Sequence, residues 1–309
     1  MGLKQFKPVH WLYNLFHYKE LKHNRQAYKK YNINKPLIAS ISSKDFPDKT
    51  SRAWLDNGDA AVLAPQKEAF ASFPSDIQQG ISNWSKNGYM ILKNFLTAET
   101  CDAINTTIND LQQSGKLHFT NGNKLMFANK KSKLVRDVAN DAGLKKILGF
   151  LLDKEVVAFQ TINFIQGSEQ RAHSDSIHMT TYPLGYLIAV WIALEDVSAD
   201  NGPLFYFPGS HQLPYLLNND FNKGSTALML GKKDYSDYED VLEELVEKNN
   251  YERKEFHAQK GDILIWHANL VHGGAPIAKP GSTRKSMVVH YYATDVIKYH
   301  EITERPSLL

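Results

Sequence analysis

From residue 155 onward the chain is a succession of short strand-like segments separated by turns, and this pattern limits the possible folds more than any other feature. The predicted strands lie at 156–166, 184–194, 203–207, 262–267 and 284–293. Short strands bounded by turn residues at such intervals are typical of an all-β sandwich or barrel. We therefore predict a mainly β core over residues 155–295.

Helical patterns precede this core and interrupt it once. Three helices are predicted over 75–86, 97–113 and 133–152, with a strand at 89–95 after the first. The interruption lies within 217–255 and is either a lid over a site or a surface loop. We expect the chain to divide into an arm and irregular linker at 1–65, a main domain at 66–300 with helical bracing at 75–152, and a tail at 301–309.

Composition excludes several classes of protein. Of 309 residues, 42% are hydrophobic and 22% are charged, which is ordinary for a globular chain. The longest apolar run, 186–194, is about half the length of a membrane span. The single cysteine, Cys101, excludes an intramolecular disulfide and a cysteine-built zinc site. Because the N-terminus also lacks an apolar secretory segment, we expect a cytoplasmic protein.

Positive charge is concentrated in the N-terminal arm. Residues 1–35 hold eight basic residues and one acid, Glu20, for a net charge of +7, whereas the remainder has 28 basic and 32 acidic residues, or −4. A mildly acidic main body argues against a nucleic-acid partner. The aromatic, basic arm either makes peripheral contact with an anionic membrane or forms a helix that packs on its own domain through Leu12, Leu15 and Phe16. We favour the second interpretation.

A His-x-Asp pair is the strongest chemical signal. In an extended segment His173 and Asp175 project from the same face, so both can bind one metal ion. A third ligand has to come from another segment, and His267 and His272 are both candidates. Two histidines and one carboxylate on one face of a metal form the facial triad of non-haem Fe(II) oxygenases.

Arg284 and Ser286 are predicted to share one face of a strand that begins twelve residues after His272. An inward-facing guanidinium beside a hydroxyl group can bind a carboxylate, because arginine offers two parallel N–H donors. The alternative is an arginine on the surface of a strand. The pattern therefore indicates, but does not require, a site for an organic acid.

These motifs together resemble the phytanoyl-CoA dioxygenase-like family of Fe(II)/2-oxoglutarate oxygenases. The resemblance covers roughly residues 75–295 and includes Asn87-Gly-Tyr-Met-Ile-Leu, His173-Ser-Asp175, Asn201-Gly-Pro-Leu-Phe-Tyr-Phe-Pro-Gly-Ser-His211, Lys260-Gly-Asp-Ile-Leu-Ile-Trp-His, His272-Gly-Gly and Arg284. It implies a jelly-roll, cupin-like double-stranded β-helix core with flanking helices. It also implies Fe(II) and 2-oxoglutarate as cofactors, and it leaves ascorbate open as a reductant.

By position in the family motifs, His173, Asp175 and His272 would be the iron ligands and Arg284 would bind the distal carboxylate of 2-oxoglutarate. The resemblance places Asn163 and Trp191 near the cosubstrate, although Trp191 can equally be a core residue. Relatives often carry a hydroxyl residue where this chain has Gly274, so Ser286 or Thr283 would have to supply that hydroxyl, and we favour Ser286. Substrate contacts are expected from His178, Met179 and Tyr182, and a structural role is expected for His211.

The expected activity is hydroxylation of a small-molecule or acyl/lipid-like substrate, with release of succinate and CO2. The presence of Asp175 agrees with hydroxylation, because family halogenases have a small residue there. Desaturation, epimerisation and cyclisation remain open, as does the oligomeric state. A different class of function is also open: a catalytically idle, metal-containing β-barrel binding protein tethered by its basic arm.

Overall fold

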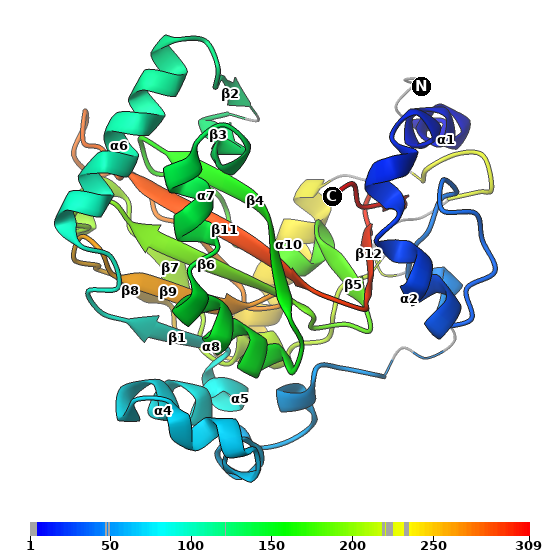
Figure 1. Cartoon of the computed structure of the whole chain (residues 1–309), viewed down its shortest axis with the longest axis horizontal. Helices are drawn as coiled ribbons and strands as arrows, with labels where there is room; N and C mark the ends of the chain where they lie inside the picture. Colours follow the sequence, from blue (N-terminus) through cyan, green and yellow to red (C-terminus); the bar gives the residue numbers. More distant parts are fainter. Residues whose placement is uncertain are drawn as a thin grey trace.

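The computed structural model describes residues 5–46, 48, 50–120, 122–217, 220, 225–231 and 235–309. Residues 1–4 of the basic arm, with Lys4, and segments 218–219, 221–224 and 232–234 of the insertion lie outside the described residues. In the described part, a large antiparallel sheet packs against a smaller one, and helices cover the outer face of the large sheet (Figure 1). The predicted mainly β fold with flanking helices is confirmed, and the two facing sheets form a double-stranded β-helix core.

Three sheets contain all the named strands of the described residues. The strands are β1 (Tyr89–Leu92), β2 (Phe119–Thr120), β3 (Lys124–Met126), β4 (Val156–Phe164), β5 (Thr180–Tyr182), β6 (Leu187–Ala193), β7 (Leu204–Tyr206), β8 (Lys254–Phe256), β9 (Ile263–His267), β10 (His272–Gly274), β11 (Ser286–Ala293), β12 (Ile297–His300) and β13 (Arg305–Pro306). The large sheet has the order β1-β9-β6-β11-β4-β3-β2, and the facing sheet has the order β10-β7-β8. A third sheet, β13-β12-β5, lies beside the N-terminal helices.

The α-helices lie at the N-terminal end, on the outer face of the large sheet and beside the smaller sheet. They are α1 (Lys7–Phe16), α2 (Asn24–Lys30), α3 (Ala60–Leu63), α4 (Ser75–Ser82), α5 (Trp84–Asn87), α6 (Ala98–Gln113), α7 (Lys133–Ala139), α8 (Ala142–Leu152) and α10 (Tyr235–Lys248). None of these described helices is long and apolar enough to cross a membrane.

The alternation of side chains along the central strands separates a structural face from a functional face. On β11, Met287, Val289 and Tyr291 pack in the cluster formed with α6, α7 and α8. Val288 lies in the cluster between the two sheets, and Ser286, two residues earlier, has the same orientation. Each strand of the large sheet therefore directs every second side chain toward the interior of the double-stranded β-helix.

The predicted helix over 133–152 is two helices in the structure. Asn140 ends the first, and the side chain of Asp141 accepts a hydrogen bond from the backbone N–H of Leu144 at the start of the second. Asparagine and aspartate favour such helix ends because their side chains replace missing backbone partners. The predicted first helix is likewise divided, at Asn83.

The N-terminal segment packs on the third sheet. Leu21, Ala27 and Tyr28 form a buried cluster with Ile297 and Tyr299 of β12. Figure 1 shows α1 and α2 beside β12, at one end of the molecule. The segment is thus attached mainly through α2 and the residues that flank it.

The predicted packing of α1 is wrong. Leu12, Leu15 and Phe16 are 57%, 54% and 81% exposed, respectively, instead of packing on the domain. The side of α1 that faces the domain is polar, with Lys7 and Asn14 buried. Helical spacing predicted correctly that the helix has two different sides. The polar side is the buried one, because the rest of the chain provides hydrogen-bonding and charged partners for it.

Candidate metal centre

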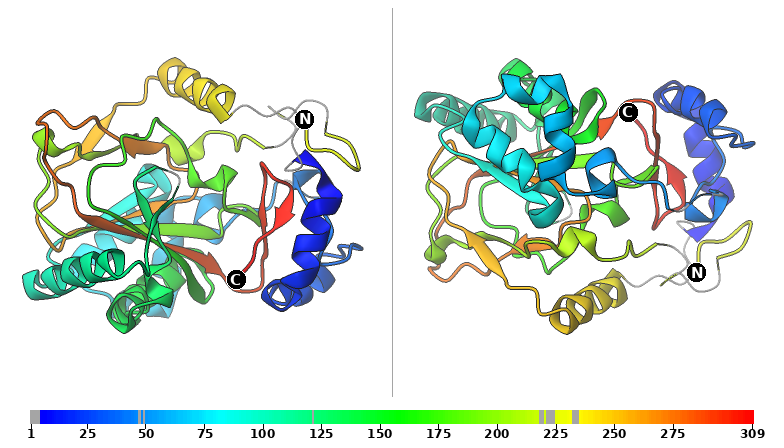
Figure 2. Two further views of the ribbon diagram at one scale, coloured as in Figure 1. Left: turned by 90° about the horizontal axis from the view of Figure 1, so that it is seen from above. Right: turned by 90° about the horizontal axis from the view of Figure 1, so that it is seen from below.

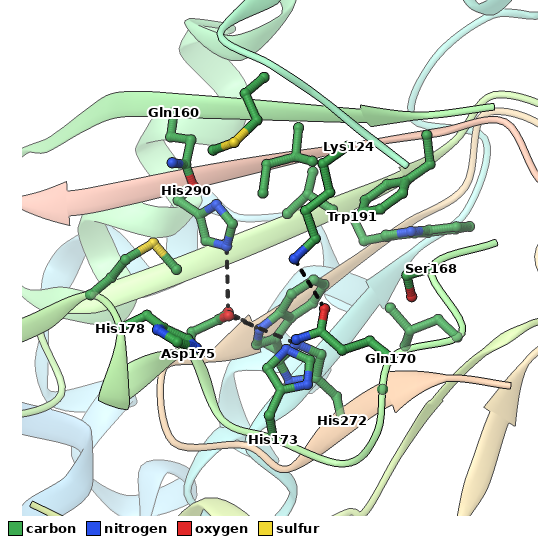
Figure 3. A pocket seen from close by; sticks show the side chains of 18 of the residues that line it. Lys124, Gln160, Ser168, Gln170, His173, Asp175, His178, Trp191, His272 and His290 are labelled. Carbon is green, nitrogen blue, oxygen red and sulfur yellow. Dashed lines mark hydrogen bonds and ion pairs between the residues drawn. The ribbon is translucent and has the colours of Figure 1, made fainter. Parts of the chain in front are cut away.

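A short backbone pairing brings the predicted metal ligands together. The backbone N–H of His173 donates to the carbonyl of His272 at 2.9 Å, and the reverse hydrogen bond has the same length. This bridge joins the loop after β4 to β10. As a result, ligand atoms of His173, Asp175 and His272 lie within 4.8 Å of one another, and all three residues are buried. Figure 3 shows the three side chains converging at one point of the pocket.

The two imidazoles have their metal-binding nitrogens free. Nδ1 of His173 donates to the carbonyl of Arg171 at 2.9 Å, and Nδ1 of His272 donates to the carbonyl of Leu270 at 3.0 Å. These hydrogen bonds place the proton on Nδ1, so each Nε2 has a lone pair available for a metal. Both rings are thereby held in the tautomer that an Nε2-coordinated metal requires.

The carboxylate of Asp175 is held from one side. Its Oδ2 accepts a hydrogen bond from Nε1 of Trp266 at 2.8 Å and lies 3.5 Å from Nε2 of His290. Its Oδ1 lies 3.9 Å from Nε2 of His272. The arrangement leaves Oδ1 on the side of the two histidines and suits one-oxygen coordination.

Burial and neighbouring charges set the protonation states. Burial lowers the pKa of His173 to about 3 and also lowers the pKa of His272. Burial acts to raise the pKa of Asp175, but the neighbouring imidazoles of His272 and His290 outweigh it, so this pKa lies below its usual value. Neutral imidazoles with an ionised carboxylate are the donor set that a divalent metal binds, so the residues fit the implied iron.

We expect Trp266→Phe to weaken metal binding by roughly 10–100-fold, because the substitution removes the donor that orients Asp175. The measurement is a titration of the purified variant with Co(II), followed by its visible absorption. The matched control is Trp84→Phe, which changes a buried tryptophan of α5 outside the pocket lining. Equal affinities in all three proteins would show that the hydrogen bond has no role in metal binding.

A second group of polar atoms lies beside the triad. Arg284 is 1% exposed and its guanidinium carbon lies 5.5 Å from the ring centre of Trp191. Nε of Arg284 and Nε1 of Trp191 have no hydrogen-bond partner among the described residues. Burial lowers the pKa of Arg284 to about 10, partly opposed by Glu195, so the guanidinium is still charged at neutral pH. A buried cation with unused donors fits an anionic ligand such as a dicarboxylate.

The pocket that contains these groups has a volume of about 270 Å³. Its lining includes predicted residues, namely His173, Asp175, His178, Met179, Trp191, His272 and Arg284. The lining also includes residues that sequence reasoning missed, namely Lys124, Gln160, Ser168, Gln170, His290 and His300. His290 could have been found, because it lies four residues after Ser286 on the same strand face. Lys124 and Gln170 come from segments with no recognisable motif.

Three predicted contacts lie elsewhere. Asn163 is on the opposite face of β4, across from Met287, because the strand alternation directs it toward the helical layer. Tyr182 stacks on Phe46 in the cluster under the N-terminal segment, with ring centres 4.1 Å apart. Ser286 faces the interior but is fully buried and does not line the pocket.

The structure also shows the environments of His267, the alternative third ligand, and of His211. Nε2 of His267 lies 3.1 Å from Oδ2 of Asp56, in a separate pocket, so His272 is the histidine that joins the triad. His211 donates from Nε2 to the carbonyl of Ser85 at 3.2 Å, consistent with the structural role expected for it.

The helical insertion is packed on the ligand-bearing loop. Nitrogen of Ser174 donates to the hydroxyl of Tyr238 at 3.1 Å, and Arg171 forms ion pairs with Asp240 and Glu243 of α10. The ring of Tyr235 lies 4.8 Å from that of His178. Of the two interpretations left open by the sequence, a helix that covers the metal-binding loop agrees better with these contacts than an isolated surface loop.

Comparisons with known proteins point in one direction. The model of the family "Phytanoyl-CoA dioxygenase (PhyH)" matches residues 84–286. A phytanoyl-CoA dioxygenase domain-containing protein 1 from Danio rerio is 30% identical over 112 residues, which are 35% of this chain and 34% of that protein. The peroxisomal phytanoyl-CoA dioxygenase of Homo sapiens is 27% identical over 131 residues, 41% of this chain and 35% of that protein. The matched region thus spans about a third of the length of each of these curated relatives.

Solved structures show the same fold. The non-haem α-ketoglutarate-dependent carbocyclase SnoK from nogalamycin biosynthesis matches 75% of this chain and 89% of its own, with a TM-score of 0.58 and 15% identity. EctD from S. alaskensis, solved with 2-oxoglutarate and 5-hydroxyectoine, matches 82% of this chain and 86% of its own, with a TM-score of 0.54 and 19% identity. At these identities the likeness concerns the fold.

Proposed function

The chain belongs to the phytanoyl-CoA dioxygenase family, and from this premise we propose that it is an Fe(II)- and 2-oxoglutarate-dependent dioxygenase that hydroxylates a small molecule. One observation carries the proposal: the buried triad of His173, Asp175 and His272 shares a pocket with Arg284, whose Nε has no partner among the described residues. A metal-binding protein without this chemistry has no need for a buried guanidinium, unpaired in the described part of the chain, beside its metal ligands.

The residues of the chain have separate tasks in this reaction. His173, Asp175 and His272 would hold Fe(II) from one side, which leaves the opposite positions for ligands. Arg284 would bind the distal carboxylate of 2-oxoglutarate, and the ring of Trp191 beside it would exclude water. When bound, iron and 2-oxoglutarate supply the oxidation, in which O2 gives one oxygen atom to the substrate C–H bond and one to succinate, with loss of CO2.

Lys124 is a second cation of the pocket. Its Nζ donates to Oε1 of Gln170 at 3.2 Å, as Figure 3 shows, and burial lowers the pKa of its amine, opposed by the charge of Asp175. No carboxylate among the described residues forms an ion pair with Lys124. We assign to it a role in binding an anionic or polar group of the cosubstrate or the substrate.

The pocket also limits the substrate. A volume of about 270 Å³ has to hold the cosubstrate as well, so a small substrate or the reactive end of a larger one fits. The wall combines apolar side chains, such as Ile162 and Val288, with the hydrogen-bonding groups of Gln160, His178 and His300. The volume shared with the cosubstrate favours a compact substrate over a long acyl chain, and the polar groups of the wall can orient it.

An anaerobic titration tests the function directly. Addition of Fe(II) and then 2-oxoglutarate to the purified protein is expected to produce a weak visible charge-transfer band, because the keto acid chelates the metal through two oxygen atoms. Succinate is the matched control, since it has two carboxylates but no keto group and should give no band. An iron-loaded, folded protein that gives no band with 2-oxoglutarate would contradict the proposal and favour a binding protein.

The same preparation separates the substrate classes. Compact polar compounds and acyl thioesters are compared by the extent to which each increases the consumption of 2-oxoglutarate in air. We expect stimulation by the polar class. Stimulation by long acyl thioesters alone would contradict the assignment made from the pocket volume.

A further inference from the structure

The first helix presents its apolar side to solvent. Leu12 and Tyr13 each lie three or four residues from Val9 and from Phe16, so these four side chains share one face of α1. All four are exposed, and Phe16 is 81% exposed. Proteins in water rarely expose a contiguous group of large apolar side chains unless that group binds a partner or a membrane.

Polar contacts on the opposite side hold α1 in this orientation. Nζ of Lys7 lies 2.5 Å from Oε2 of Glu304, and both side chains are nearly buried. Nδ2 of Asn14 donates to the carbonyl of Ile38 at 2.9 Å, and Nε1 of Trp11 donates to a side chain at the same distance. Rotation of α1 to bury its apolar face would break these hydrogen bonds and leave buried polar groups unpaired.

The segment that follows α1 is strongly basic. Five exposed side chains carry positive charge there, namely Lys19, Lys22, Arg25, Lys29 and Lys30. No carboxylate of the described residues forms an ion pair with any of them. Both views in Figure 2 place α1 and α2 together at one end of the molecule. The apolar face and the basic segment therefore belong to the same end of the protein.

We propose that α1 docks on an anionic lipid surface, with its apolar face (Val9, Leu12, Tyr13 and Phe16) and the adjacent exposed Leu15 inserted among the acyl chains. Apolar side chains beside lysine and arginine are the combination that binds the interface of a membrane containing anionic lipids. A second copy of the chain fits less well, because pairing through α1 would bring two basic segments together. The proposal does not depend on the enzymatic activity.

Vesicle sedimentation of the full chain tests the proposal. The probes are phosphatidylcholine vesicles with and without phosphatidylserine, and we expect binding to the anionic vesicles that decreases as salt is raised. A variant with Leu12→Ser, Leu15→Ser and Phe16→Ser should bind about tenfold more weakly or worse, because three exposed apolar groups no longer enter the lipid. A second variant, Lys19→Glu with Lys22→Glu, should lose the preference for anionic lipid.

The matched control is Val62→Ser on α3, where a 61% exposed apolar residue lies outside the proposed surface. All substituted residues are exposed, so circular dichroism should show unchanged folding. Equal binding of the triple variant and the control would overturn the proposal. Failure of the wild-type chain to bind anionic vesicles would also overturn it. In that case light scattering would show whether the wild-type chain forms a dimer, and loss of the dimer in the triple variant would identify a second copy as the occupant.

Discussion

Replacement of Asp175 by alanine is expected to reduce Fe(II) affinity and 2-oxoglutarate consumption by more than about 100-fold, beyond the effect of changing a supporting residue. Asp175 is the only anionic ligand in the triad, and its Oδ1 faces the two histidines. The substitution also leaves Nε1 of Trp266 without its acceptor. The measurements are metal content after dialysis against Fe(II) and the rate of succinate formation without added substrate.

The control for this result is Asp56→Asn. Asp56 pairs with a buried histidine, His267, but lies in a different pocket from the triad. We expect this variant to retain its iron and its turnover. If Asp175→Ala kept full metal content and full turnover in a folded protein, the assignment of the triad would be incorrect.

Replacement of Arg284 by methionine is expected to raise the dissociation constant for 2-oxoglutarate by roughly 100-fold or more. The reason is that a bidentate carboxylate contact consists of two charge-assisted hydrogen bonds, each worth about 1.5–3 kcal/mol. Fe(II) affinity should change little, because Arg284 is not part of the triad. The checks are the intensity of the charge-transfer band as a function of 2-oxoglutarate and a separate titration with Fe(II).

Arg284→Met should weaken 2-oxoglutarate binding but stabilise the ligand-free protein. The guanidinium of Arg284 is buried and its pKa is lowered to about 10 by burial, so the ligand-free fold carries the cost of a desolvated charge. We expect Arg284→Met to raise the thermal midpoint of the ligand-free protein. Arg253→Met, at an exposed arginine bonded to Glu255, is the control and should alter neither binding nor the midpoint. Unchanged 2-oxoglutarate binding in Arg284→Met would contradict the role of this residue.

Local patterns predicted the strands well because alternation and turn residues are properties of a short segment. All five predicted core strands are present, and the shared face of Ser286 and Val288 follows from a period of two. The same rule would have identified His290. By contrast, whether Asn163 faces the pocket or the helices depends on its pairing with Met287, which a single strand does not reveal.

In the metal centre, too, some features follow from a local pattern and others depend on contacts between distant segments. The His-x-Asp pair was visible in the sequence, whereas the residue pattern left both His267 and His272 as candidates for the third ligand and only the family resemblance favoured His272. The backbone bridge between His173 and His272, which joins residues 99 positions apart, supplies the physical reason for that choice. Lys124 and Gln170 reach the pocket from unrelated segments, so no local motif could place them there.

The sequence by itself determined the strand pattern, the two-sided character of α1 and the pair of ligands at His173 and Asp175. Only the tertiary structure decided which side of α1 is buried, because burial depends on the partners that meet the helix. Glu304 and the carbonyl of Ile38 bind its polar side, and the apolar side is left to solvent. The periodicity of a sequence shows that a helix has two different faces, whereas contacts with the rest of the fold determine which face is buried.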